Sequence, residues 1–121
     1  MADRVRHRQQ WVGRTAFAAV VAISLVVLFT PASGVPTGFS VSDKLVHCLL
    51  FAALAVSGRS AGISVAHLAI GLVAYAGVSE VLQSTLPIDR DGDVRDALAD
   101  TLGVVTGLVV VGLGSRLRTK P

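Results

Sequence analysis

The chain has 121 residues, of which 52% are hydrophobic and only 16% are charged, and its net charge is +3. A soluble domain of this size buries too little surface to hide so much apolar area, so the composition excludes an ordinary soluble globular domain and favours a lipid environment. The positive charge does not indicate nucleic-acid binding, because the basic residues flank apolar segments and do not alternate with aromatic ones.

Four apolar segments follow one another along the chain, at residues 11–29, 41–57, 61–83 and 96–114. Crossing the hydrocarbon core takes about 20 residues of helix, and the second segment is the shortest of the set. Backbone in lipid must satisfy its own hydrogen bonds, and no alternating strand pattern is present. The prediction is therefore an all-α fold with four transmembrane helices. Proline, glycine and polar residues predict loops at 31–38, 57–62 and 84–93.

Basic residues are divided unequally between the two predicted sides of the membrane, and this bias sets the orientation. The larger group comprises Arg4, Arg6, Arg8, Arg14, Arg59, Arg116, Arg118 and Lys120, and the smaller group comprises Lys44, Arg90 and Arg95. The sequence therefore predicts a multi-pass protein with both termini in the cytoplasm. We divide it into a basic tail at 1–10, a membrane domain at 11–115 and a second basic tail at 116–121.

The first apolar segment has a second interpretation, a cleaved secretory signal. A basic stretch precedes it, and the small residues ASG at 32–34 follow it. The later apolar segments would still hold the chain in the membrane, so both interpretations give an integral membrane protein.

Acidic residues concentrate on the predicted outward side, where six of them lie within residues 80–100. Asp93, Asp96, Asp100, Gly103 and Gly107 are spaced three, four, three and four residues apart, which places them along one side of a helix. An ionised aspartate is unfavourable against lipid, so this side is predicted to face the bundle interior. The two glycines are predicted to let another helix backbone approach closely.

Two other segments carry polar residues at the same predicted depth. Asp43, Lys44 and His47 open the second segment, and Glu80 and Gln83 share a face near the end of the third. We therefore predict a polar pocket that opens outward between the helices. Its predicted ligand-binding residues are Asp43, Lys44, His47, Glu80, Gln83, Arg90, Asp93, Asp96 and Asp100. A purely structural interpretation stays open for several of them, because helix caps and charge neutralisation use the same residue types.

The acidic loop does not match an EF-hand. Asp89, Asp91 and Asp93 occupy its first three ligand positions, but Val94 stands where glycine is needed and Asp100 where glutamate ends the loop. We expect no cofactor and no metal site, and the sequence leaves open whether this loop binds a divalent cation.

Three motifs together resemble the VanZ-like family of small bacterial membrane proteins: DKLVH from residue 43, SEVLQ from 79 and PIDRDGDVRDALADTLGVVTG from 87. The family pattern has Asp-Lys-x-x-His, Glu-x-x-Gln, and then Arg, Asp, Asp, Asn and two glycines at these spacings. This sequence departs from the pattern at Asp100, where the family usually has Asn. The resemblance covers about three of the four predicted spans and implies the same topology and the same polar residues.

The resemblance also implies a place in the bacterial cytoplasmic membrane and, through the founding member, an association with teicoplanin resistance. We expect membrane lipids or lipid-linked envelope precursors as partners, with Arg90 binding a phosphate or carboxylate of the head group. Two alternatives stay open. In the first, the protein is a membrane-embedded acid–base enzyme acting on a lipid head group, and His47 or Glu80 is the base. In the second, the acidic residues only stabilise the helix bundle, and the protein is a scaffold for another membrane protein. The sequence does not indicate the oligomeric state.

Overall fold

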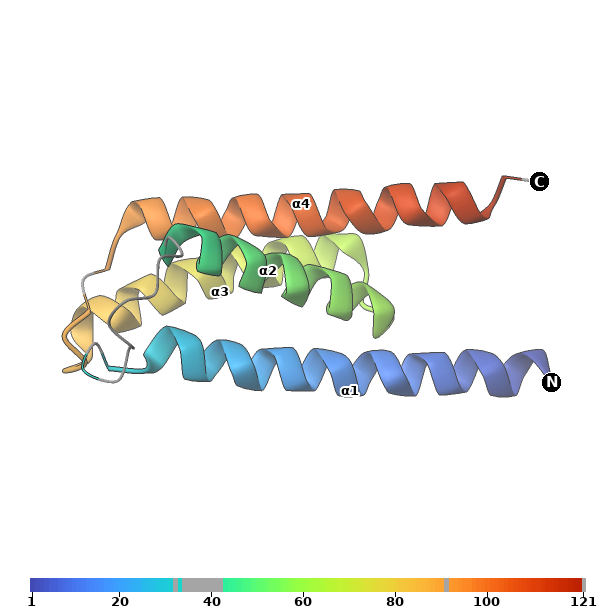
Figure 1. Ribbon diagram of the computed structural model, residues 1–121, viewed down its shortest axis with the longest axis horizontal. Coiled ribbons are helices and arrows are strands. Elements are labelled where there is room, and N and C mark those ends of the chain that lie inside the picture. The colour runs from blue at the N-terminus through green and yellow to red at the C-terminus, as the bar shows by residue number, and fades with distance from the viewer. Residues whose placement is uncertain (32, 34–42, 91, 121) are drawn as a thin grey trace.

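The computed structural model describes residues 1–31, 33, 43–90 and 92–120, and within them the chain forms four helices (Figure 1). These are α1 at Ala2–Phe29, α2 at Asp43–Ser60, α3 at Val65–Thr85 and α4 at Val94–Arg118. Consecutive helices run in opposite directions along the long axis. The start of α1 and the end of α4 therefore lie at one end of the bundle. The other end, which we call the loop end, holds the ends of α1 and α3 and the starts of α2 and α4.

Helices α1, α3 and α4 are long and apolar enough to cross a membrane. They carry large apolar side chains on their outer surfaces, among them Val26 at 66% exposure, Ile70 at 72% and Leu102 at 60%. Exposed apolar surface of this extent is typical of a chain that is surrounded by lipid. The all-α prediction is confirmed, and three of the predicted spans have the length and composition that a membrane requires. Helix α2 is the shortest, at 18 residues.

The most extensive contact between helices joins α2 to α4, and the predicted glycine face lies within it. A Cβ atom on Gly103 would overlap the carbonyl oxygen of Cys48, and one on Gly107 would lie 2.7 Å from the carbonyl oxygen of Ala52. Both glycines are buried together with Val104. Their missing side chains let the two backbones meet, as small residues do between membrane helices.

The helix ends differ from the predicted segment ends. Helix α1 begins at Ala2, nine residues before residue 11, and α4 continues to Arg118. The predicted tail boundaries therefore do not coincide with helix ends. Arginine is a good helix former, so both helices extend past the apolar region. In α4 the basic side chains of the last turn also interact favourably with the helix dipole.

Local signals set the remaining boundaries. Gly62 adopts a φ of +90° in the turn after α2, a conformation that glycine tolerates. The Ser64 side chain then accepts a hydrogen bond from the His67 backbone N–H at 3.3 Å and caps α3. Most of the predicted loop at 31–38, the start of the second segment at 41 and Asp91 lie outside the described residues.

Candidate functional site

Polar side chains from three helices meet at the loop end of the bundle. His47 comes from the start of α2, Glu80 from the end of α3, and Asp96 and Asp100 from the start of α4. They are only 2%, 8%, 7% and 0% exposed, respectively. The predicted acidic face of α4 thus turns inward and meets polar residues of the two neighbouring helices.

Lys44 connects the start of α2 to the start of α4. Its Nζ lies 3.0 Å from Oδ1 of Asp96 and 3.5 Å from Oδ2 of Asp93. Asp93 also caps α4, because its Oδ1 accepts a hydrogen bond from the Arg95 backbone N–H at 2.9 Å. That hydrogen bond, assisted by the positive charge of Lys44, holds the pKa of Asp93 below its ordinary value.

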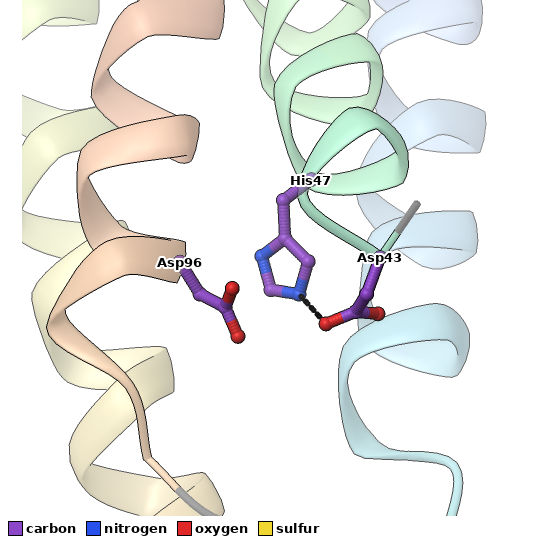
Figure 2. Close-up of side chains that lie close together, drawn as sticks. All are labelled: Asp43, His47 and Asp96. Atoms are coloured by element: carbon purple, nitrogen blue, oxygen red, sulfur yellow. Dashed lines mark ion pairs between the residues drawn. The ribbon is translucent and has the colours of Figure 1, made fainter. Parts of the chain in front are cut away.

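His47 is the centre of the cluster. Its Nδ1 lies 2.8 Å from Oδ1 of Asp100, and this contact is buried. Its Nε2 lies 3.7 Å from Oδ2 of Asp43, which is much more exposed. Figure 2 shows the imidazole between the carboxylates of Asp43, on its own helix, and Asp96, on α4. The ring therefore has acidic groups on several sides.

Glu80 joins α3 to the start of α4. Its Oε2 accepts a hydrogen bond from the backbone N–H of Asp93 at 2.9 Å. A groove of about 330 Å³ runs beside this contact and is lined by Glu80, Ser84, Gly92 and Asp93, among others. Of the four buried polar residues, only Glu80 lines this groove.

Two of the predicted site residues, Gln83 and Arg90, bind backbone of α1 and the residue that follows it. Nε2 of Gln83 donates to the carbonyl of Leu28 at 2.7 Å, and Nε of Arg90 donates to the carbonyl of Thr30 at 2.8 Å. Gln83 is 2% exposed, whereas Arg90 is half-buried. These two side chains thus hold the end of α1, whereas the other predicted residues form the contacts of His47, Lys44 and Glu80 described above.

Among the described residues, two groups of side chains bring ligand atoms close enough together for a metal ion. One comprises Asp43, His47 and Asp96, and the other His47, Glu80 and Asp100. Within each group the ligand atoms lie within 4.8 Å of one another. The buried His47–Asp100 contact also has the arrangement of a base with a carboxylate that orients it. The arrangement is therefore chemically compatible with metal ligation and with proton transfer.

Sequence reasoning missed four structural contacts near the site. Ser24 and Tyr75 share a hydrogen bond of 2.9 Å between α1 and α3, and a Cβ on Gly92 would lie 2.7 Å from the carbonyl oxygen of Glu80. The carbonyls of Leu28 and Thr30 were also missed. The last carbonyls of any helix lack a partner within that helix, but this rule does not identify which side chain donates to them.

Comparison with known protein families, with curated proteins and with solved structures found no match for this chain.

Proposed function

We propose that this chain is a VanZ-like, multi-pass protein of the bacterial cytoplasmic membrane that binds the anionic head group of a lipid or lipid-linked glycan at its loop end. The three sequence motifs support the family assignment. The excess of basic residues near the termini supports a cytoplasmic location for both of them. A fourth span by α2 is supported by Leu45, Leu49 and Val56, which are exposed along its outer face.

The observation that carries this proposal is the position of Arg90. Its Nε is held by the carbonyl of Thr30 at 2.8 Å, and this is the only hydrogen bond of its side chain among the described residues. A guanidinium group has five N–H donors in a planar fork. One bond to the backbone therefore orients the group, and the donors on its terminal nitrogens suit a phosphate or carboxylate.

The groove beside Glu80 supplies groups of complementary chemistry. Ser84 and Asp93 line it, and their side-chain oxygens can accept hydrogen bonds. Hydroxyl groups of a sugar or glycerol head group are donors of the kind such oxygens bind. This groove therefore supports recognition of the polar part of an envelope lipid, with the anionic part bound at Arg90.

Titration of the purified protein with phosphatidylglycerol or phosphatidylcholine, followed by native mass spectrometry, tests the proposal. Arg90→Ala is expected to weaken binding of the anionic lipid about tenfold or more, because a charged hydrogen-bonded contact is lost. Arg116→Ala removes an exposed arginine at the opposite end of the bundle and is the matched control. Equal phosphatidylglycerol binding by wild type and Arg90→Ala would overturn the proposal.

A cellular consequence follows if the bound lipid alters the outer leaflet or its precursors. Expression of the protein is then expected to lower susceptibility to lipoglycopeptides such as teicoplanin, and Arg90→Ala is expected to abolish that effect at equal expression. The minimum inhibitory concentration in a susceptible host measures it.

A second candidate function, acid–base catalysis on a lipid head group, is favoured by the buried His47–Asp100 contact of 2.8 Å. His47 would act as the base and Asp100 would orient its ring. A mass change in extracted envelope lipids that requires His47 would favour this function over binding alone.

A further inference from the structure

Two carboxylate oxygens at the centre of the cluster have no hydrogen-bond partner among the described residues. They are Oε1 of Glu80 and Oδ2 of Asp100, and both are fully shielded from solvent. Their residues are 8% and 0% exposed. Buried polar atoms are normally satisfied, and a buried carboxylate needs a compensating cation or hydrogen-bond donor. The two oxygens therefore indicate a missing partner.

We propose that His47, Glu80 and Asp100 bind a divalent transition-metal ion inside the bundle, and that Zn²⁺ suits these ligands best. Their ligand atoms lie within 4.8 Å of one another and come from three different helices. Zinc binds imidazole nitrogen and carboxylate oxygen at about 2.0–2.2 Å, so tetrahedral ligand atoms are about 3.4 Å apart. The bound of 4.8 Å on the ligand-atom separations is larger than this spacing, so metal binding would involve small side-chain movements.

The charges of the cluster support an ion of charge +2. Glu80 and Asp100 supply two carboxylates, and a neutral imidazole supplies the third ligand. Lys44 pairs with Asp93 and Asp96, and among the described residues no lysine or arginine forms an ion pair with Glu80 or Asp100. A divalent cation neutralises both buried carboxylates, which removes the main penalty for placing them together within a membrane protein.

The surroundings hold one ligand in place, and the three ligands leave one coordination position open. Oε2 of Glu80 accepts the Asp93 backbone N–H at 2.9 Å, an outer contact of the kind that orients metal ligands. A groove of about 330 Å³ lies between α3 and α4 and is lined by Glu80, Ser84, Gly92 and Asp93, among others. Three protein ligands leave a fourth position for water or a substrate oxygen, as in catalytic zinc sites.

The outer group of Asp43, His47 and Asp96 is the weaker candidate. The Asp43 side chain is 65% exposed, and Figure 2 shows it at the edge of the cluster. Asp96 is already paired with Lys44 at 3.0 Å. An ion there would compete with an existing ion pair, whereas the inner group has unpartnered oxygens that point to a missing cation.

This inference goes beyond head-group binding and does not depend on Arg90. Its test is a titration of the full-length protein in detergent, treated first with EDTA and then with Zn²⁺, followed by isothermal calorimetry and by metal analysis of the desalted protein. We expect one Zn²⁺ per chain and a higher melting temperature when the ion is present. Mg²⁺, which prefers oxygen ligands, is expected to bind more weakly.

Glu80→Gln and Asp100→Asn retain the size of the side chains and are each expected to weaken Zn²⁺ binding at least about tenfold. His67→Asn removes an exposed histidine of α3 and is the control for adventitious binding. Asp43→Asn decides between the two groups, because it removes a ligand of the outer one alone. No stoichiometric Zn²⁺ in the wild type, or binding that Asp43→Asn abolishes and Glu80→Gln leaves intact, would overturn the inference.

The two proposals fail separately. A protein that binds Zn²⁺ but not phosphatidylglycerol retains the metal site and loses the proposed function. A protein that binds the lipid through Arg90, but with no Zn²⁺, retains the function and loses the metal site.

Discussion

Gln83 on α3 donates its side-chain Nε2–H to the backbone carbonyl of Leu28 on α1, at a distance of 2.7 Å. Both residues are buried, at 2% and 0% exposure. Carbonyls in the last turn of a helix have no partner within that helix, and lipid offers none. The glutamine therefore satisfies the end of α1 and joins it to α3.

Replacement of Gln83 tests this connection. Gln83→Leu retains most of the side-chain volume but leaves the Leu28 carbonyl without its donor. We expect the free energy of unfolding to fall by about 0.5–2 kcal/mol. Thermal unfolding in detergent measures the change. Gln9→Leu, an exposed position on α1, is the control, and equal melting temperatures for Gln83→Leu and wild type would contradict the structural role.

The contact between α2 and α4 predicts that alanine in place of two different glycines of α4 has opposite effects on stability. A Cβ on Gly103 would overlap the Cys48 carbonyl, whereas one on Gly112 would meet nothing within 4 Å. Gly103→Ala is therefore expected to destabilise the protein by about 1–3 kcal/mol. Gly112→Ala is expected to be neutral or to stabilise it by up to about 1 kcal/mol, since alanine is the better helix former. Comparable melting temperatures for the two variants would rule out this packing.

Glu80 has a structural role that does not require an ion. Its Oε2 accepts the Asp93 backbone N–H at the start of α4, and a glutamine carbonyl can accept the same bond. With EDTA present, Glu80→Ala is expected to destabilise the protein by about 1–3 kcal/mol, because the N–H loses its acceptor. Glu80→Gln is expected to change stability by less than about 1 kcal/mol. Denaturant unfolding measures both, and a glutamine variant as unstable as the alanine variant would exclude this role.

The Asp93 carboxylate is expected to make the stability of the protein depend on pH. The Arg95 backbone N–H, with help from Lys44, lowers the pKa of Asp93 in the folded protein. The ionised carboxylate therefore adds stability above its unfolded pKa of about 4, and this contribution is lost as the pH falls through the lower folded value. Asparagine also caps helices but does not titrate.

Comparison of wild type with Asp93→Asn isolates this contribution. The difference in melting temperature between the two proteins is expected to be constant from about pH 7 to 5 and to shrink below about pH 4. Thermal unfolding at several pH values measures it. Parallel pH profiles down to about pH 3 would show that the carboxylate makes no such contribution.

The sequence by itself determined the helical fold, because long apolar segments in lipid must satisfy their backbone hydrogen bonds internally. It also determined that the acidic and glycine positions of α4 share one face, because that follows from the spacing of Asp93, Asp96, Asp100, Gly103 and Gly107. The loop-end location of the polar residues followed from the same reasoning.

Only the tertiary structure decided which polar groups meet. Helical periodicity fixes a residue's face but not the rotation of one helix against another, so the pairing of His47 with Asp100 was not predictable from the spacing. The same holds for Gln83 and Arg90, whose acceptors are backbone carbonyls that every residue has. Whether a polar side chain binds a neighbouring helix or faces an open groove depends on packing between distant segments. The spacing of residues along one helix does not determine that packing.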